Sequence, residues 1–268
     1  AADVSGGSRL VNEGLFNLAT RPLFVPDASA TPKEETQLVR LSGEENKIST
    51  FESSGVIYFG GKYVEKTELQ DADGSLKPHD ELLEVLGKES ADPSAQIIYG
   101  VDLGNYATFE NTGAMATGAS IRNLTMVRVD NANEASDSPS FVNRGSMLLR
   151  AGNTDEGNGL NAAVRVNAGS ALNDENGTIE LTGTNSVGLY AVEEGAFVEN
   201  KGSIVVGTLG VDYTPNYGIW LENGTEGRNS GSIKLVGNGA IGVHARSGAH
   251  VVMEGGEGAG IDFNAEAQ

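Results

Sequence analysis

Short runs of alternating apolar and polar residues recur along the chain, and asparagine and glycine separate them. The first repeated pattern is a short alternating run, an Asn-x-Gly corner and a second alternating run. It covers residues 109–113, 141–149, 197–206 and 229–235, and a displaced copy covers residues 172–181. The glycines of the five copies lie 32, 32, 25 and 29 residues apart, at Gly113, Gly145, Gly177, Gly202 and Gly231. Repetition with a period of about 20–50 residues is typical of a solenoid or an array.

A second pattern keeps step with the first. Its alternating runs begin 25, 30 and 24 residues apart, at Ala163, Gly188, Gly218 and Gly242. Alternation with a period of two residues predicts strands with one buried face. Glycine and asparagine suit the corners between strands because they accept positive φ at low steric cost. A strand-and-corner unit that stacks on its own copies predicts an all-β protein with the fold of a parallel β-helix.

Residues 1–108 carry the same patterns with interruptions. Copies of the first pattern cover residues 10–16 and 51–59, with polar insertions expected at residues 28–45 and 62–93. The second insertion contains a predicted short helix at residues 79–86, because Pro78 precedes it and Gly87 follows it. A last thin strand is expected between residues 254 and 263. We therefore expect one continuous solenoid, with interrupted coils in residues 1–108 and regular coils in residues 109–268.

Composition narrows the classes of partner. The 268 residues carry a formal charge of −19, which argues against binding to nucleic acid or docking on anionic lipid through a basic patch. The chain has no cysteine, which excludes thiolate metal sites and disulfides. It begins at Ala1 without a methionine, as a product cut after a signal peptide would. An open last coil would leave strand edges unpaired, so we expect the natural chain to continue past Gln268.

Candidate catalytic residues are missing from the repeated positions. Cleavage of a glycosidic bond by two carboxylates needs them roughly 5–9.5 Å apart. The outward positions of the first pattern hold one acid and one base, in the order Leu148, Glu180, Val205 and Lys234. The three histidines lack metal-ligand spacing, at His79, His244 and His250. We therefore expect no enzyme activity, cofactor or metal, although a polysaccharide-active β-helix enzyme remains the first alternative.

The second pattern supplies the candidate binding residues. Its inward positions are expected to hold Val164, Leu189, Ile219 and Val243. The next residues should then point outward, one above another, as Arg165, Tyr190, Trp220 and His244, and Tyr213 and Tyr217 extend the group. Aromatic side chains that face solvent offer flat apolar area with a polar handle, which suits sugars or protein partners. The alternative is that a neighbouring segment covers the rings. The corner asparagines are expected to form a structural ladder, at Asn111, Asn143, Asn200 and Asn229.

The Asn-x-Gly corners, the Gly-Leu/Ile/Val strands, the lack of cysteine and the acidic balance resemble the passenger domain of a bacterial autotransporter. The resemblance is clearest over residues 109–263. It implies a right-handed β-helix with three faces, exported and then displayed at the outer surface or secreted. The C-terminal translocator of that family is not within these residues, and neither is the serine motif of its proteases. The resemblance therefore implies an adhesin or aggregation factor that binds host matrix protein, glycan or itself. A structural stalk and a phage tailspike are further alternatives.

Overall fold

The computed structural model describes 24 β-strands. The described residues are 2–18, 35–59, 68–72, 77–78, 81, 85, 97–118, 123–130, 138–150, 160–209, 215–255 and 260–263. The strands form three sheets of eight strands each, which we name sheets A, B and C, and every pair of neighbouring strands is parallel.

Each sheet takes every third strand of the chain. Sheet A contains, in stacking order, β1 (Ala2–Ser5), β4 (Glu35–Ser42), β7 (Ile97–Leu103), β10 (Leu124–Val129), β13 (Asn161–Val166), β16 (Ser186–Ala191), β19 (Asn216–Leu221) and β22 (Ala240–Ala245). Sheet B contains β2 (Arg9–Asn12), β5 (Ser49–Ser53), β8 (Ala107–Asn111), β11 (Ser140–Asn143), β14 (Ser170–Asn173), β17 (Phe197–Asn200), β20 (Glu226–Asn229) and β23 (His250–Met253). Sheet C contains β3 (Leu15–Leu18), β6 (Val56–Phe59), β9 (Ala114–Thr117), β12 (Ser146–Leu149), β15 (Thr178–Leu181), β18 (Ser203–Val206), β21 (Ser232–Leu235) and β24 (Gly260–Phe263).

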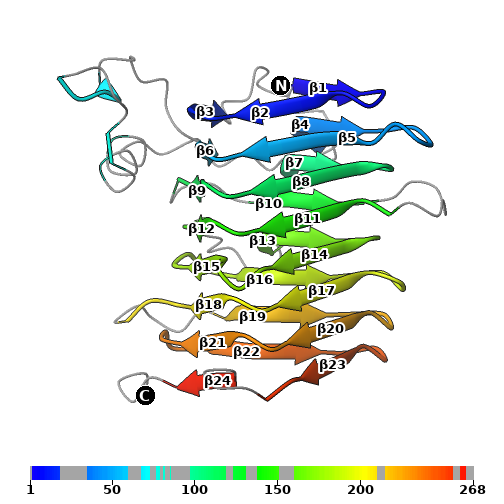
Figure 1. Ribbon diagram of the computed structural model, residues 1–268. Helices are drawn as coiled ribbons and strands as arrows, with labels where there is room; N and C mark the ends of the chain where they lie inside the picture. The colour runs from blue at the N-terminus through cyan, green and yellow to red at the C-terminus, as the bar shows by residue number, and fades with distance from the viewer. Residues whose placement is uncertain are drawn as a thin grey trace, which may run out of the picture.

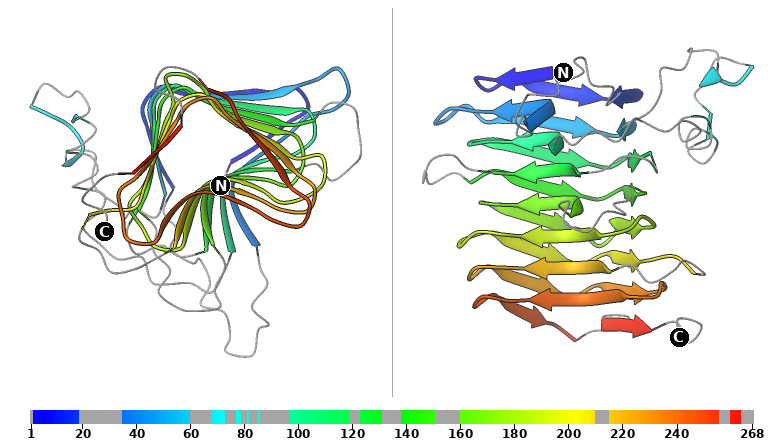
Figure 2. Two further views of the ribbon diagram at one scale, coloured as in Figure 1. Left: turned by 90° about the horizontal axis from the view of Figure 1, so that it is seen from below. Right: turned by 180° about the vertical axis from the view of Figure 1, so that it is seen from behind.

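The chain passes through sheets A, B and C once in each coil, and each coil stacks on the one before it (Figure 1). Seen along the axis, the three sheets form the sides of a triangular column (Figure 2). The fold is thus a right-handed parallel β-helix, as the sequence predicted. All three sheets continue through the interrupted N-terminal coils into the regular ones.

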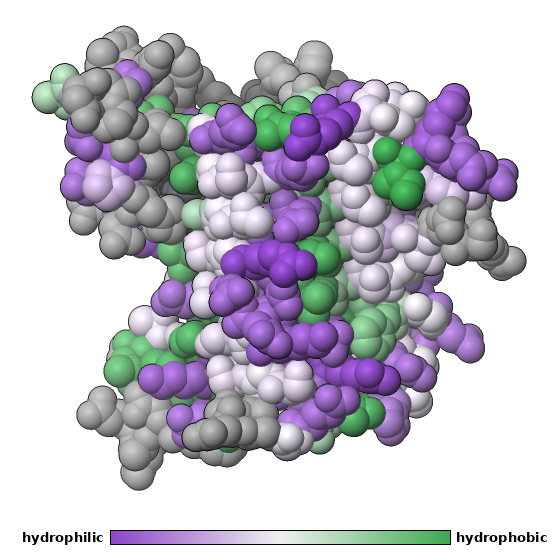
Figure 3. Space-filling model, in the orientation of Figure 1, coloured by the Kyte–Doolittle hydropathy of each residue, from purple (hydrophilic) through white to green (hydrophobic). Residues whose placement is uncertain are grey.

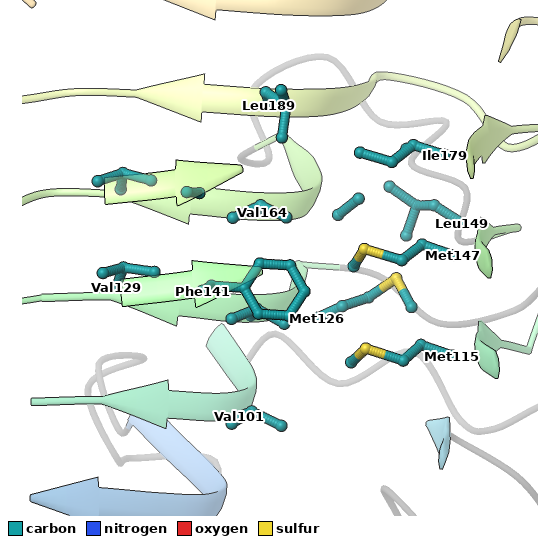
Figure 4. Close-up of a cluster of buried hydrophobic side chains, with 14 of the residues drawn as sticks. Val101, Met115, Met126, Val129, Phe141, Met147, Leu149, Val164, Ile179 and Leu189 are labelled. Atoms are coloured by element: carbon teal, nitrogen blue, oxygen red, sulfur yellow. The ribbon is translucent and has the colours of Figure 1, made fainter. Parts of the chain in front are cut away.

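A narrow apolar column fills the interior. Figure 4 shows labelled side chains from several coils, among them Met115, Met147 and Ile179 of sheet C, which point inward and stack. In the first half of the column the rings of Phe51 and Phe109 stack with centroids 4.5 Å apart. Each inward side chain packs against the side chain at the same position of the next coil. A stack of aliphatic and aromatic residues at each inward position therefore forms a continuous core.

The corner between sheets B and C explains the Asn-x-Gly pattern. Asn111 donates through Nδ2 to Oδ1 of Asn143, which donates in the same way to Asn173, and both distances are 2.8 Å. The ladder continues through Asn200 to Asn229, and all five asparagines are fully buried. Glycine follows because a Cβ at Gly145 would collide with the carbonyl oxygen of Gly113 in the coil below. The predicted structural ladder is confirmed.

The displaced copy of the pattern forms a longer corner and adds a fifth asparagine to the ladder. The asparagine that precedes Gly177 in the sequence is Asn176, but the ladder position is filled by Asn173. The corner there holds two more residues than the corner at Gly145, and Gly177 closes it by donating its N–H to the carbonyl oxygen of Asp174 at 2.7 Å. The glycine keeps its place in the column while the longer turn bulges outward.

The prediction of the first insertion is partly wrong. Residues 28–45 were predicted to be a polar insertion, yet residues 35–42 form β4, a full strand of sheet A. Its inward side chains, Val39 and Leu41, are fully buried, and Arg40 between them is exposed. The polar residues around this run hide its alternation in the sequence.

Two described apolar residues of the second insertion lie against the outer face of sheet C. The predicted helix at residues 79–86 falls in a stretch of which the structure describes only residues 81 and 85. Val85 and Leu69 pack on the outward side chains of Tyr58 and Ala116. The hydroxyl of Tyr58 is buried without a hydrogen-bond partner among the described residues, and burial raises its pKa to about 12.

Candidate functional site on the outer face of sheet A

Sheet A carries one continuous column of outward side chains. Each member stands between two inward aliphatic residues, as Arg165 does between Val164 and Val166. The strand register places the members one above another in the order Asp3, Arg40, Asp102, Arg128, Arg165, Tyr190, Trp220 and His244. The column therefore begins with alternating charges and ends with aromatic rings.

The middle of this column is a buried ion pair. Arg128 donates through Nε and Nη2 to the two carboxylate oxygens of Asp102, at 2.6 and 2.9 Å. Its guanidinium lies 3.8 Å from the ring centroid of Tyr99. Burial disfavours the charged guanidinium, but the hydrogen bonds and charge of Asp102 outweigh this and raise the pKa of Arg128. The two side chains bond each other, so this pair stabilises sheet A and does not offer a free group to a ligand.

Three rings end the column, and Tyr217 lies beside them. We call this group of four rings, Tyr190, Tyr217, Trp220 and His244, the aromatic cluster. The ring centroid of Trp220 lies 4.3 Å from that of Tyr217, 4.7 Å from that of His244 and 5.8 Å from that of Tyr190. The planes are tilted by 56–65° to one another. All four residues are partly exposed, so the cluster is an uneven aromatic surface rather than a core.

The position of Tyr217 depends on an irregularity that β19 shares with the neighbouring strands of sheet A. Tyr217 and Trp220 are three residues apart, and strict alternation would place them on opposite faces. The register pairs Tyr217 with Val187 and Ile241 and resumes at Ile219, leaving out Gly218. A Cβ at Gly218 would lie 2.7 Å from the carbonyl oxygen of Gly242, so glycine is needed there. The irregularity brings Tyr217 to the outer face beside Trp220.

Charged side chains surround the rings. The guanidinium of Arg165 lies 5.6 Å from the ring centroid of Tyr190, and that of Arg246 lies 5.3 Å from the centroid of Trp220. Arg246 forms an ion pair with Glu222, whose carboxylate is almost fully buried. Burial raises the pKa of Tyr190, the charge of Glu222 and its hydrogen bond with the phenol raise it further, and the charges of Arg165 and Arg246 act in the opposite direction. These contacts fix the orientation of the rings.

Five of the six predicted binding residues lie together on this face: Arg165, Tyr190, Tyr217, Trp220 and His244. Tyr213, the sixth, lies outside the described residues. The predicted inward positions are also confirmed, because Val164, Leu189 and Ile219 are almost fully buried and Val243 packs against the core.

Two features of the face were missed from the sequence. One is the buried pair of Asp102 and Arg128. The signal that could have found it is the aliphatic-x-aliphatic triplet, which occurs at residues 101–103 in the interrupted coils and at residues 127–129 in the regular ones. The other is the pair of Glu222 and Arg246, which lie at corners beyond the ends of β19 and β22 and therefore show no strand alternation.

The other faces provide a comparison. The predicted outward positions of sheet C are neighbours in the register, in the order Leu148, Glu180, Val205 and Lys234. The face that includes sheet B shows a vertical band of hydrophilic side chains bordered by residues of intermediate hydropathy (Figure 3).

Within the described ranges, no three histidine or carboxylate side chains lie close enough together to hold a metal ion. The described part of the chain also contains no helix long and apolar enough to cross a membrane.

A family model, the BigA third pectate lyase-like domain, matches residues 84–220, just over half of the chain. The matched stretch includes Arg165, Tyr190, Tyr217 and Trp220, and it ends before His244. No curated protein and no solved structure matches the chain.

Proposed function

Because this chain belongs to the family of the BigA third pectate lyase-like domain, we propose that it is a non-catalytic binding domain of a bacterial surface or secreted protein. The family is named after a domain of a bacterial surface protein, which supports this location. The finer form of the proposal is an adhesin or aggregation factor of the autotransporter passenger type. It rests on the resemblance of the Asn-x-Gly corners and on the β-helix that they build.

The aromatic cluster is the observation that carries the proposal. Tyrosine and tryptophan side chains on an outer strand face do not contribute to the inner column. Their exposed apolar surface stays in contact with water, which is unfavourable, and such a surface is typical of a binding site. Glu222 and Arg246 hold the rings in place, so little side-chain entropy is lost when a partner binds. The partner would be a host matrix protein, a glycan or a second copy of the chain. No nucleic acid partner is proposed, since the chain carries a net charge of −19.

Display of the chain on non-adherent bacteria tests this function. Cells that display the wild-type chain should clump or attach to surfaces coated with matrix protein or glycan. Cells that display Tyr190→Ala/Trp220→Ala should lose most of this adhesion, because each large aromatic contact contributes about 1–3 kcal/mol or more to binding at an interface. The matched control is Phe197→Ala, which removes a partly exposed ring from β17 of sheet B.

The alternatives make different predictions in the same assay. If displayed, folded wild-type protein neither clumps cells nor attaches to any surface, the binding function is wrong and a structural stalk takes its place. If the double variant adheres as well as the wild type, the binding surface lies elsewhere on the molecule. Degradation of a polysaccharide by the purified chain would contradict the non-catalytic part of the proposal.

A further inference from the structure

The charge around the aromatic cluster is opposite in sign to that of the whole molecule. The chain carries 37 acidic and 18 basic residues, yet two arginines flank the rings and one carboxylate, Glu222, contacts them. Glu222 is paired with Arg246, so that pair is neutral. Arg165 is then the charged side chain at the rings that has no carboxylate partner of its own among the described residues. The carboxylate behind it, that of Asp130, forms an ion pair with Arg128 and reaches Arg165 only through Asn167.

Arg165 is oriented but not neutralised. Its Nε donates to Oδ1 of Asn167 at 2.9 Å. Among the described residues it forms no ion pair with a carboxylate, in contrast to Arg128 one strand below. A guanidinium presents its remaining N–H groups in a planar fork that matches a carboxylate. Arg165 is therefore a partly exposed anion-binding group placed beside Tyr190.

We propose that the aromatic cluster binds an oligosaccharide that carries an isolated carboxylate, such as a sialyl or terminal uronyl group. Arg165 receives the carboxylate, and Tyr190 and Trp220 pack against the adjoining sugar ring. The proposal rests on the binding function proposed above and specifies its ligand class.

The spacing of the strands suits such a ligand. Neighbouring strands of a sheet are about 4.8 Å apart, so Arg165, Tyr190 and Trp220 span about 10 Å along the axis. An anionic substituent and the sugar ring beside it can therefore reach Arg165 and the rings at the same time. The tilt between the rings favours one or two sugar units over a long flat polymer.

The overall charge limits how much negative charge the ligand can carry. A densely charged polymer extends beyond the cluster, where a chain of charge −19 repels it. One carboxylate held against Arg165 experiences mainly the local charge, because the Debye length is about 8 Å at physiological salt. The expected order of affinity is therefore a singly charged oligosaccharide first, its neutral analogue second and a polyuronate last.

The single tryptophan makes the test direct. Trp220 is the only tryptophan in the sequence, so tryptophan emission reports on this cluster alone. The full chain is titrated with sialyllactose, with lactose as the neutral analogue and with polygalacturonate as the dense polyanion. We expect sialyllactose to change the emission in a saturable way. It should bind at least tenfold more tightly than lactose, and its affinity should fall as salt is added.

Variants of Arg165 test its assigned role. Arg165→Gln should weaken sialyllactose binding about tenfold or more without affecting lactose, because a bidentate charge-assisted contact is lost. Arg165→Lys keeps the charge and should be intermediate. The matched control is Arg228→Gln, which removes an exposed arginine that lies 5.9 Å from the ring of Phe197 on another face and should leave binding unchanged. Circular dichroism melts show whether each variant is folded.

The outcomes separate this inference from the general function. Equal binding of sialyllactose and lactose, unchanged binding by Arg165→Gln, or preference for polygalacturonate would each overturn the assignment of the ligand. A folded wild-type chain that binds none of the three probes would overturn it as well. The proposed binding function fails only if the displayed chain also shows no adhesion.

Discussion

The asparagines inside the β-helix are buried at a position that successive coils repeat. Four of the five, Asn111, Asn143, Asn173 and Asn200, donate to the amide oxygen of the next coil, and backbone carbonyls such as that of Gly145 accept as well. The hydroxyl of Tyr58 is the opposite case, because it is buried on an outer face without such a repeat. Removal of a ladder asparagine should therefore lower the stability of the protein, whereas removal of the Tyr58 hydroxyl should not.

Asn173→Ala should destabilise the protein by about 3 kcal/mol. The substitution leaves the acceptor of Asn200 without its ladder partner and the donor of Asn143 with only the longer bonds to backbone carbonyls. Each unsatisfied buried group costs about 1–3 kcal/mol. Urea unfolding followed by circular dichroism measures the change. Glu180→Ala, at an exposed position of the next strand, is the control and should change stability little. Equal effects of the two variants would show that the ladder adds nothing.

Tyr58 should make stability depend on pH above 10. The unfolded chain releases the phenol proton near pH 10, whereas burial raises the pKa of Tyr58 in the folded protein to about 12. The folded state therefore binds more protons between these values, and stability is present below pH 10 and falls by about 2–3 kcal/mol as the pH approaches 12. In Tyr58→Phe the fall should be smaller, and stability at pH 7 should be equal or higher. A variant with the wild-type pH profile would contradict the burial of this hydroxyl.

At the scale of strands, alternation allowed most of the elements to be predicted. An aliphatic residue on each side of one outward residue identified β13, β16, β19 and β22 and placed Tyr190 above Arg165. The same rule applies to β4, but polar neighbours conceal Val39 and Leu41, and this strand was missed. Tyr217 was expected to extend the outward group, and it lies there because the strands of sheet A break their alternation at the position of Gly218, whereas strict alternation would have placed it inward.

The pair of Asp102 and Arg128 joins β7 to β10 and should be needed for stability. Asp102→Ala leaves the buried guanidinium with only the carboxylate of Asp130, whose Oδ2 lies 3.6 Å from Nη1 of Arg128. The loss should therefore lie near the lower end of the about 3–5 kcal/mol that breaking a buried ion pair costs. Arg9 and Glu52 form a pair of the same geometry between β2 and β5 but are largely exposed. Glu52→Ala is therefore the control and should have a much smaller effect in the same denaturation experiment. A similar loss in both variants would contradict the role of burial.

At the scale of the whole molecule, the repeat explains the fold but not the site. The inward aliphatic residues, the ladder asparagines and the corner glycines build the column, so most outer positions are not constrained by it. The sequence showed the rings because they occupy equivalent positions of successive coils. It could not show Glu222 and Arg246, because their positions depend on how the corners turn. The proposed ligand class rests on Arg165, which the repeat did show, and the neutral pair of Glu222 and Arg246 holds the rings beside it.

A competition experiment tests the assignment of the aromatic cluster most directly, because it does not depend on how much of each variant reaches the cell surface. Purified wild-type chain, added in excess, should block attachment of cells that display the wild-type chain. Purified Tyr190→Ala/Trp220→Ala, folded as judged by circular dichroism, should not block it at the same concentration, whereas Phe197→Ala should block it fully. Equal inhibition by the wild type and the double variant would show that the outer face of sheet A is not the binding surface.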